Sequence, residues 1–328
     1  MIIAHRLCPD SRDRLIPHSL LPGEKVPDGV AWIDLLEPTK EEDLQLEALL
    51  AISIPTRDDM DDIEPSELLW TENGTRYMTA RLLVKLDTGE PEITAVTFIL
   101  SGSTLVTVRY SDPKPFPMFV SHASKPGGCG GSAEAVMSGL LDTIIDRAAE
   151  VLQNTGERLD TLSRNVFKET VKQGDRNATL QRTLRALGRH NDLISKARES
   201  LVSIERVLLS LSAGFKASHV SPQLREEVKT TLRDLQSLEE HASFQSNKIQ
   251  FLLDATLGLV NLEQNNIIKL FSVMAVIFMP PTLVASVYGM NFENMSELKW
   301  EYGYPMALGL MVIVAVAPYL WFRWKNWL

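Results

Sequence analysis

The residues with the clearest chemical pattern lie near the C-terminus and carry small, hydroxyl or amide side chains. Small or thin side chains recur at alternating spacings of three and four residues: Ser272, Ala275, Met279, Thr282, Ser286 and Gly289. This 3.5-residue repeat places them on one seam of a helix. Continued toward the N-terminus, the repeat gives Ile268, Asn265, Asn261, Gly258 and Asp254. Polar groups that persist for several turns favour a water-filled pathway; a close-packed interface of small residues between helices is the alternative.

Neutral oxygens on such a seam suit a hydrated divalent cation. Mg²⁺ is small and gives up its water reluctantly, so a site for it can bind the outer hydration shell. Asn291, just beyond Gly289 and Met290, would supply a ring of amide oxygens if several copies surrounded one axis. Thr282 and Ser286 would add hydroxyls. Carboxylates within the helix would hold the ion too firmly to release it.

Two further features near the seam have open alternatives. Met279 precedes Pro280-Pro281, where a ring of thioethers could close a pore by excluding water, or could simply pack. Three acids follow Asn291 and would either concentrate cations at the opening or be merely solvated: Glu293, Glu297 and Glu301.

The elements that must position these residues are two uncharged stretches, Leu270–Tyr288 and Tyr302–Phe322. At about 1.5 Å per residue each spans roughly 30 Å, the thickness of a bilayer's hydrocarbon core. Both are free of ionisable residues that could relay protons, so we expect passive flow. The pattern predicts a membrane hairpin.

Charges beside these stretches predict its orientation. Lys269 precedes the first, and Arg323 and Lys325 follow the second. Positive flanks stay inside, so we expect both termini in the cytoplasm, the loop 289–301 outside, and the inner (plasma) membrane as the location.

The chain before the membrane predicts a mixed α/β domain followed by long helices. Thr39 and Glu42 form a capping-box pattern at the start of a helix. Ser221-Pro222 opens a helix without another proline until Pro280. Alternating or apolar runs predict strands at Val30–Leu35, Tyr77–Leu86, Ile93–Leu100 and Thr104–Tyr110.

Charge and composition exclude several classes of function. Residues 266–328 hold four basic and three acidic side chains, so the net charge of −9 lies entirely in residues 1–265. That argues against a nucleic-acid partner and suits either a cation-attracting vestibule or a solvated acidic surface. We find no nucleophile–base pair, Walker loop or His/Cys metal cluster, so an enzyme is not expected.

The C-terminal segments resemble the CorA family of magnesium and cobalt transporters over about residues 255–328. The resemblance is carried by IFMPPTLVASVYGMN, YGMNFENMSELKWEYGYP and PYLWFRWKNWL. It implies a funnel-shaped homopentamer in a lipid bilayer, with Gly289-Met290-Asn291 as the selectivity filter for hydrated Mg²⁺. It also implies Co²⁺ and Ni²⁺ as further substrates.

The resemblance also implies roles for individual residues. It assigns the family's pore-lining positions to Asn265, Ile268, Phe271, Ser272, Met279, Thr282 and Ser286, with Asp254 as a pore-facing acid. The family senses intracellular Mg²⁺ through acids between subunits. Asp87 would be one of them. The position expected for its partner is Thr230, which is not acidic, so Asp234 is the substitute.

The expected fold class is an α+β cytoplasmic domain with a long stalk helix and two C-terminal transmembrane helices. The predicted divisions are a cytoplasmic α/β domain (1–130), a helical hairpin (131–221), a stalk helix (222–288) whose end is the first span (about 267–288), a loop (289–301), a second span (302–323) and a tail (324–328).

Two other functions are open. A zinc transporter of the same superfamily would usually depart from the Gly-Met-Asn triplet, which is intact here. A membrane-anchored sensor or scaffold would conduct nothing.

Overall fold

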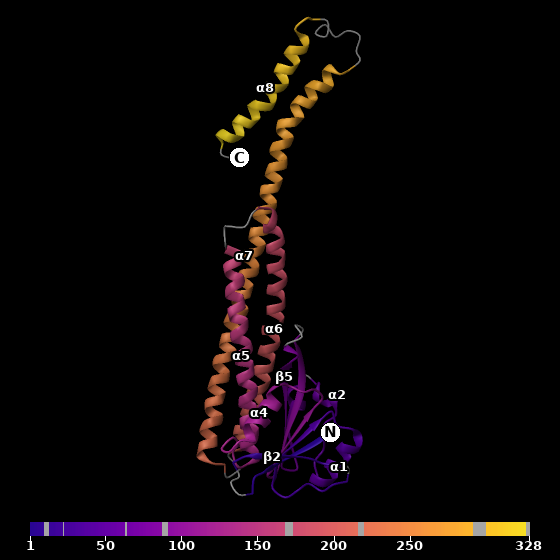
Figure 1. Cartoon of the computed structure of the whole chain (residues 1–328), viewed down its shortest axis with the longest axis vertical. Coiled ribbons are helices and arrows are strands. Elements are labelled where there is room, and N and C mark those ends of the chain that lie inside the picture. Colours follow the sequence, from indigo (N-terminus) through magenta and orange to yellow (C-terminus); the bar gives the residue numbers. More distant parts are fainter. Residues whose placement is uncertain are drawn as a thin grey trace. The chain divides into compact units, whose positions relative to one another are not determined.

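The computed structural model of the chain describes residues 1–9, 13–21, 23–62, 64–86, 91–167, 173–215, 220–290 and 300–325. They form two compact units (Figure 1). The first unit contains Met1–Glu169 and Thr183–Leu252, and the second contains Thr170–Arg182 and Leu253–Leu328.

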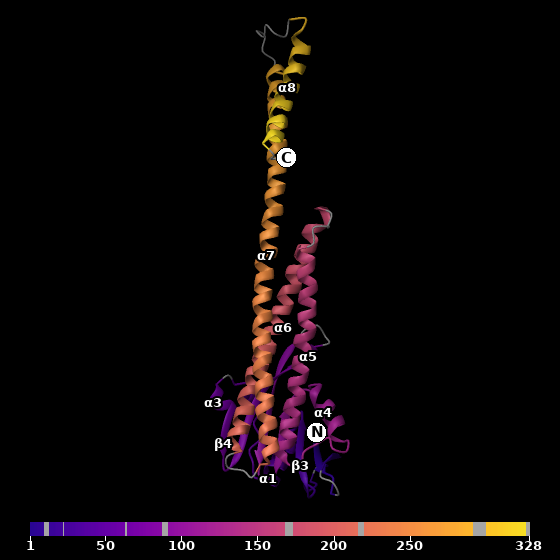
Figure 2. The ribbon, with the colours of Figure 1, turned by 90° about the vertical axis from the view of Figure 1, so that its left-hand side faces the viewer.

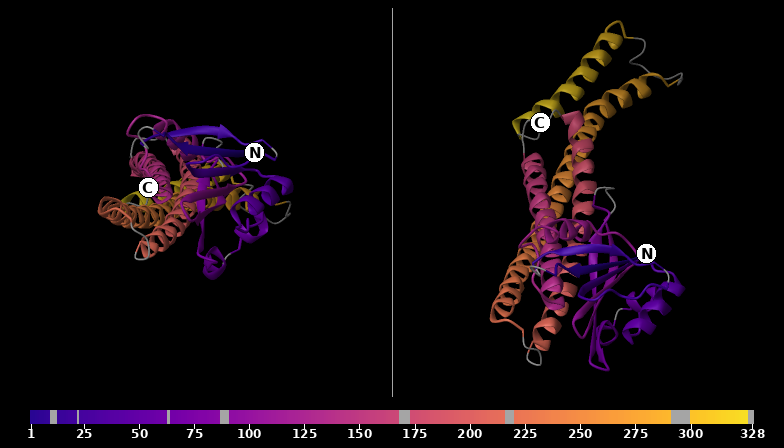
Figure 3. Two further views of the ribbon diagram at one scale, coloured as in Figure 1. Left: turned by 90° about the horizontal axis from the view of Figure 1, so that it is seen from below. Right: turned by 60° about the horizontal axis from the view of Figure 1, so that its bottom comes forward.

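A seven-stranded sheet organises the first unit, in the order β2-β1-β3-β7-β6-β5-β4 (Figure 3). Its strands are β1 (Ile2–Leu7), β2 (Leu15–Ser19), β3 (Val30–Leu36), β4 (Leu69–Glu72), β5 (Thr75–Val84), β6 (Glu92–Ser101) and β7 (Thr104–Arg109). Only the pair β3–β7 is parallel among these neighbours. The α+β class predicted from the sequence is therefore confirmed.

Helices bury both faces of this sheet. Ile33 and Leu35 of β3 share a core with Leu46 of α1 (Lys40–Leu50), which also includes Met60 of α2 (Arg57–Met60). Trp32, on the alternate face of β3, contacts rings of α4 (Pro115–Ala123), and α5 (Ala133–Phe167) packs on the same side of the sheet. The short helix α3 is Pro65–Leu68. Burial on both faces explains why every residue of β3 except Asp34 is apolar.

The predicted strands are confirmed in place, with ends shifted by one or two residues. The capping box is also confirmed, because Thr39 Oγ1 accepts from the Glu42 amide while Glu42 accepts from the Thr39 amide. Sequence reasoning missed β1, β2, β4 and α4. α4 begins in a proline-rich segment, and Pro115 occupies its first turn, where no amide hydrogen is needed for a helical bond.

Four long helices follow (Figure 2): α5 (Ala133–Phe167), α6 (Gln173–Gly214), α7 (Pro222–Tyr288) and α8 (Gly303–Trp324). The start of α7 at Pro222 agrees with prediction. α6 begins at Gln173. Gly156 does not interrupt α5. Its missing side chain lets Gln245 of α7 approach closely, and Gln245 Nε2 donates to the Leu152 carbonyl at 2.8 Å.

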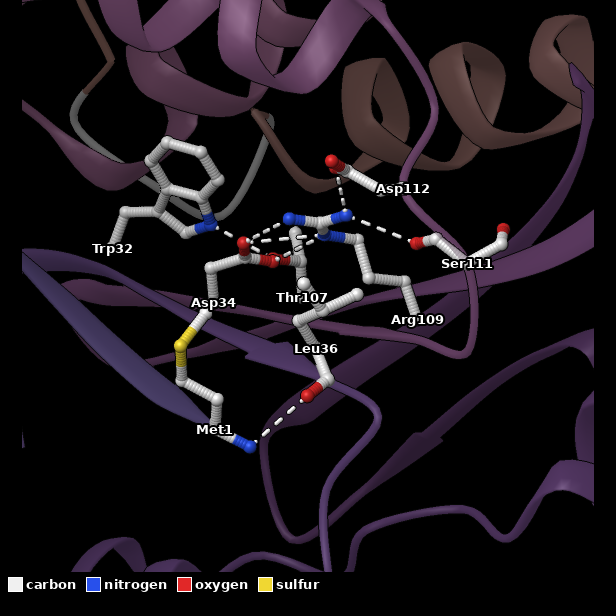
Figure 4. A network of polar contacts seen from close by, with 8 residues as sticks. All are labelled: Met1, Trp32, Asp34, Leu36, Thr107, Arg109, Ser111 and Asp112. Carbon is white, nitrogen blue, oxygen red and sulfur yellow. Dashed lines mark hydrogen bonds and ion pairs between the residues drawn. The ribbon is translucent and has the colours of Figure 1, made fainter.

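A buried ion pair joins β3 to β7 (Figure 4). Arg109 Nη2 donates to Asp34 Oδ2 at 2.8 Å and Arg109 Nε to Asp34 Oδ1 at 3.0 Å. Thr107 Oγ1 donates to Asp34 Oδ1 at 2.7 Å and accepts from Trp32 Nε1 at 2.9 Å. Arg109 also donates to the Ser111 carbonyl at 2.9 Å. Every oxygen of this buried carboxylate therefore has a donor, which is the condition for tolerating a buried charge.

His5 is a buried titratable side chain of the first unit. Its ring stacks on Trp32 with centroids 4.2 Å apart, and Nδ1 has no hydrogen-bond partner in the described part of the chain. Burial lowers the pKa of His5 to about 4; Asp34 opposes this shift and Arg109 adds to it. The unfolded chain takes up this proton below about pH 6.5, so stability present above that pH is lost as pH falls toward 4.

We therefore expect His5→Phe to flatten the acid limb of the stability curve. Phenylalanine keeps the stacking surface and removes the titration. Between pH 7 and 4.5 the wild type should lose about 2–3 kcal/mol more than His5→Phe, at 1.36 kcal/mol per pKa unit. Urea unfolding of the detergent-solubilised full chain at several pH values measures this difference. Parallel pH profiles for the two proteins would contradict it.

Candidate functional site

The C-terminal part of α7 and the whole of α8 form the second unit's two long apolar helices. Each is long and apolar enough to cross a membrane, judged by length and composition. α8 runs back beside the end of α7 (Figures 1 and 2). Few of their residues are buried within one copy of the chain. Most of this apolar surface is therefore left for lipid or for other copies of the chain.

One side of each helix is covered within the chain. On α7, Val273 is 6 % exposed and further half-buried positions follow at helical spacing: Ile277, Pro280, Val284 and Tyr288. On α8, the buried positions are Gly303, Ala307 and Phe322. This periodicity is the one expected of two helices that pack along one face of each.

The seam predicted from the sequence lies on a different side of α7, and all of its residues are exposed in the single chain. Met279 is 69 % exposed, Phe271 67 % and Ile268 61 %. The exposed set comprises Asp254, Asn261, Asn265, Ile268, Phe271, Ser272, Ala275, Met279, Thr282 and Ser286. Exposed apolar residues also occupy the remaining side of α7, Leu270 and Leu283 among them. Exposure alone does not distinguish the seam from this other exposed side. The role of the seam in lining a pore therefore stays a prediction.

Thr282 presents its oxygen as an acceptor. Its Oγ1 donates to the Phe278 carbonyl at 2.8 Å, one helical turn back. The hydroxyl hydrogen is thus occupied by the backbone, and the oxygen lone pairs remain for another partner. An oxygen oriented in this way suits a cation or the hydrogen of an ion's hydration water. α7 continues as a helix through Pro280 and Pro281, whose nitrogens donate no hydrogen bond.

At the end of α7, a side chain on Gly289 would be crowded. Its amide donates to the Ala285 carbonyl at 2.9 Å. A Cβ on Gly289 would lie 3.0 Å from that carbonyl oxygen, closer than ordinary contacts allow. The Gly289 backbone is outside the left-handed region. Met290 is 46 % exposed, and its amide donates to the Val287 carbonyl at 3.3 Å.

Several predicted site residues lie outside the described residues: Asn291, Glu293, Glu297 and Asp87. Their roles stay predictions. Glu301, the third acid of the loop, is described and is exposed beside the start of α8.

Asp234 lies in the first unit, at an acidic hollow of about 870 Å³ between α5 and α7. Asp142 lines it too, and Thr231 Oγ1 donates to the Asp142 carboxylate at 3.3 Å. The pKa of Asp142 is raised, first by burial and then by Asp146, with smaller contributions from Asp234 and Glu227. Among the described residues, no three His, Cys, Asp or Glu side chains are placed to hold a metal ion. The regulatory role of Asp234 stays a prediction.

Sequence reasoning overlooked a second repeat on α7. Buried residues follow one another at spacings of three, four or seven along the side of α7 that packs within the chain, and polar members occur among them: Leu235, Ala242, Gln245, Ile249, Leu252, Thr256 and Glu263. The same period that revealed the exposed seam could have revealed this one. The contacts of these buried residues fix α7 within the chain and leave the residues of the seam exposed.

Comparison with known proteins agrees with these features. Residues 27–324 match the family model described as CorA-like Mg2+ transporter protein. The magnesium transport protein CorA of Yersinia pseudotuberculosis is 35 % identical over 297 residues, which cover 90 % of this chain and 92 % of that protein.

Solved structures share the fold. The CorA magnesium transporter of Methanocaldococcus jannaschii matches with a TM-score of 0.74 at 16 % identity, covering 100 % of this chain and 99 % of that one. The cytoplasmic domain of ZntB from Vibrio parahaemolyticus matches with a TM-score of 0.51 at 11 % identity, covering 79 % of this chain and 97 % of that one.

Proposed function

The chain belongs to the CorA family of Mg²⁺ transporters, and on this premise we propose that identical copies of it form a divalent-cation channel, with the exposed seam of α7 as its wall. The observation that carries the proposal is that the exposed seam holds amide and hydroxyl side chains such as Asn265, Thr282 and Ser286, whereas the other exposed side of α7 is apolar. The residues of the seam are exposed, whereas the neighbouring side of α7 that begins at Val273 is covered within the chain.

The proposal requires an oligomer. One α7 cannot enclose a lumen, so several copies must contribute their seams, with α8 behind them. The resemblance to CorA supports a homopentamer. A closed ring around one axis would also cover the exposed side chains of Ile268, Phe271 and Met279, which a single chain leaves open.

We place the selectivity filter at Gly289-Met290-Asn291. The copies' amide oxygens at Asn291 would bind the hydration shell of Mg²⁺, and the Thr282 oxygens would receive the ion deeper in the pore. Neither span contains a carboxylate, which supports weak binding and release. Co²⁺ and Ni²⁺ are the additional substrates that the family resemblance supports.

The proposal also includes how the pore closes and how the chain is oriented in the membrane. Rings of Met279 side chains would close the pore by excluding water, and intracellular Mg²⁺ would control closure through sites that include Asp87 and Asp234. The basic flanks of the spans support cytoplasmic termini in the inner membrane. Flow would be passive, because neither span carries an ionisable residue to couple transport to protons.

A cadmium-block experiment tests the wall of the pore. In a background with Cys8 and Cys129 replaced by Ser, we expect Ser286→Cys to make Mg²⁺ flux sensitive to Cd²⁺. Thiolates from several copies would converge on one axis and bind this soft ion tightly. Flux into vesicles with and without Cd²⁺ is the measurement.

Val287→Cys is the matched control, because it is also exposed but lies about 100° further around the helix. Cd²⁺ block of Val287→Cys together with no block of Ser286→Cys would place the pore on another side of α7. A zinc transporter would be identified in the same vesicles by uptake of Zn²⁺ in preference to Mg²⁺. A non-conducting anchor would show no uptake of either ion.

A further inference from the structure

The apolar helices of the second unit end beside basic side chains. Lys269 directly precedes the uncharged stretch of α7, and Arg323 and Lys325 directly follow that of α8. At about 1.5 Å per residue, all three lie about 30 Å from the loop that joins the two helices. α8 runs back beside the end of α7 (Figures 1 and 2), so these cations lie at a similar depth. A span of this length ends where the headgroups of a bilayer begin.

Two of these cations lie on the sides along which the helices are covered. On α7, Lys269 is one turn before the buried residue Val273, on the same side of the helix. On α8, Lys325 follows the buried residue Phe322 by three positions, which also places the two on one side. Within the two apolar stretches, Val273 and Phe322 are the buried residues nearest the basic ends. Lys269 and Lys325 therefore lie at the same end of the packed pair of helices.

These cations have no acidic partner among the described residues. Neither Lys269 nor Lys325 forms an ion pair with another described residue. Glu263 is the one acidic residue of α7 after Asp254, and it is buried about 120° around the helix from Lys269. The sequence of α8 contains no acidic residue. Two cations at one end of a packed helix pair repel each other, so the arrangement favours an external anion.

Aromatic and aliphatic surface adjoins the cations. Lys325 Nζ lies 5.8 Å from the centroid of the Trp321 ring, and both Trp321 and Trp324 are exposed. Tryptophan is enriched at the boundary between a membrane and water, where one end of its ring system is apolar and the other is wet. Exposed apolar residues of α8 continue from there toward the loop: Leu320, Val316, Ile313 and Val312. A ligand that matches this surface has an anionic group next to a long apolar chain.

An anionic phospholipid of the cytoplasmic leaflet has this combination, and basic pockets between membrane-spanning helices bind such headgroups. We propose that Lys269 and Lys325 bind the headgroup phosphate of an anionic phospholipid, with its acyl chains along α8. The Trp321 ring keeps the Lys325 ammonium at the boundary by a cation–π contact. The inference rests on the insertion and orientation of the spans proposed above, and it is independent of which ion passes.

Fluorescence quenching of the full-length protein in nanodiscs tests the proposal. Trp321 is the reporter, and its signal is the difference between a protein and its Trp321→Phe counterpart. The discs contain about one-tenth of a lipid brominated on its acyl chains, either phosphatidylglycerol or phosphatidylcholine. A preference of about fivefold for the anionic headgroup raises occupancy by the brominated lipid from about one-tenth to about one-third. Brominated phosphatidylglycerol should therefore quench Trp321 about threefold more, and high salt should weaken the difference.

In Lys269→Gln/Lys325→Gln the two lipids should quench Trp321 equally. The matched control is Arg198→Gln/Arg206→Gln, which removes the same charge from two exposed arginines of α6 in the first unit and should behave as the wild type. Equal quenching of the wild type by both lipids would overturn the proposal, as would an equal loss of preference in the control. A preference abolished by excess inorganic phosphate at constant ionic strength would assign the cations to a soluble anion. A protein that keeps the preference but passes no ion would refute the channel and support the lipid site.

Discussion

Asn291→Ala is expected to abolish Mg²⁺ uptake while the protein still assembles in the membrane. The helix that leads to Asn291 ends at Tyr288, and Gly289 cannot gain a side chain without crowding the Ala285 carbonyl. In the proposed pore, Asn291 would lie at the opening, two residues beyond Gly289. Each copy would lose one amide oxygen there, so the whole ring would disappear at once.

The measurement is growth of a Mg²⁺-transport-deficient strain, together with flux into vesicles that contain equal amounts of purified protein. Wild type should restore growth, and Asn291→Ala should stay at the level of cells without the protein. Asn294→Ala is the matched control, because it removes the same amide group three residues further along the same loop. Uptake that is normal in Asn291→Ala and lost in Asn294→Ala would move the filter out of the Gly-Met-Asn triplet.

The largest effect on stability is expected for Arg109→Met. Arg109 and Asp34 are about 5 % and 4 % exposed, and Arg109 also lies over the Phe116 ring at 4.5 Å. Methionine fills much of the space but leaves the Asp34 carboxylate buried without its cation. Breaking such a pair from one side costs about 3–5 kcal/mol. The apparent Tm of the first unit should fall by about 10 °C.

Two comparisons make this prediction specific. Asp34→Leu/Arg109→Met removes both charges and should recover a large part of the loss, because no buried charge is left unpaired. Arg81→Met breaks the more exposed Arg81–Glu199 pair, 2.8 Å long, and should cost about 1 kcal/mol or less. Thermal unfolding of the three full-length variants in detergent provides the values. An Arg109→Met protein as stable as Arg81→Met would contradict the account of the buried pair.

Local patterns predicted much of the fold and the candidate site. Uncharged length predicted both spans, caps predicted the starts of α1 and α7, and apolar runs predicted β3, β6 and β7. The strands β1, β2 and β4 were not predicted from the sequence. They lie at or next to the sheet's edges, where polar residues such as His18 and Thr71 interrupt the alternation of apolar and polar side chains. Asp87 and Asn291 lie outside the described residues, so their roles rest on the sequence pattern.

The seam of α7 shows most clearly which properties the sequence determines and which the tertiary structure determines. The sequence by itself determined its 3–4 spacing and the absence of charge around it, because a helix period and the cost of charge in lipid are local properties. Only the tertiary structure decided that α7 is covered along the side of Val273 and that Asp34 meets Arg109. Asp34 and Arg109 are 75 residues apart and meet because β3 pairs with β7, and strand order depends on packing of the whole sheet.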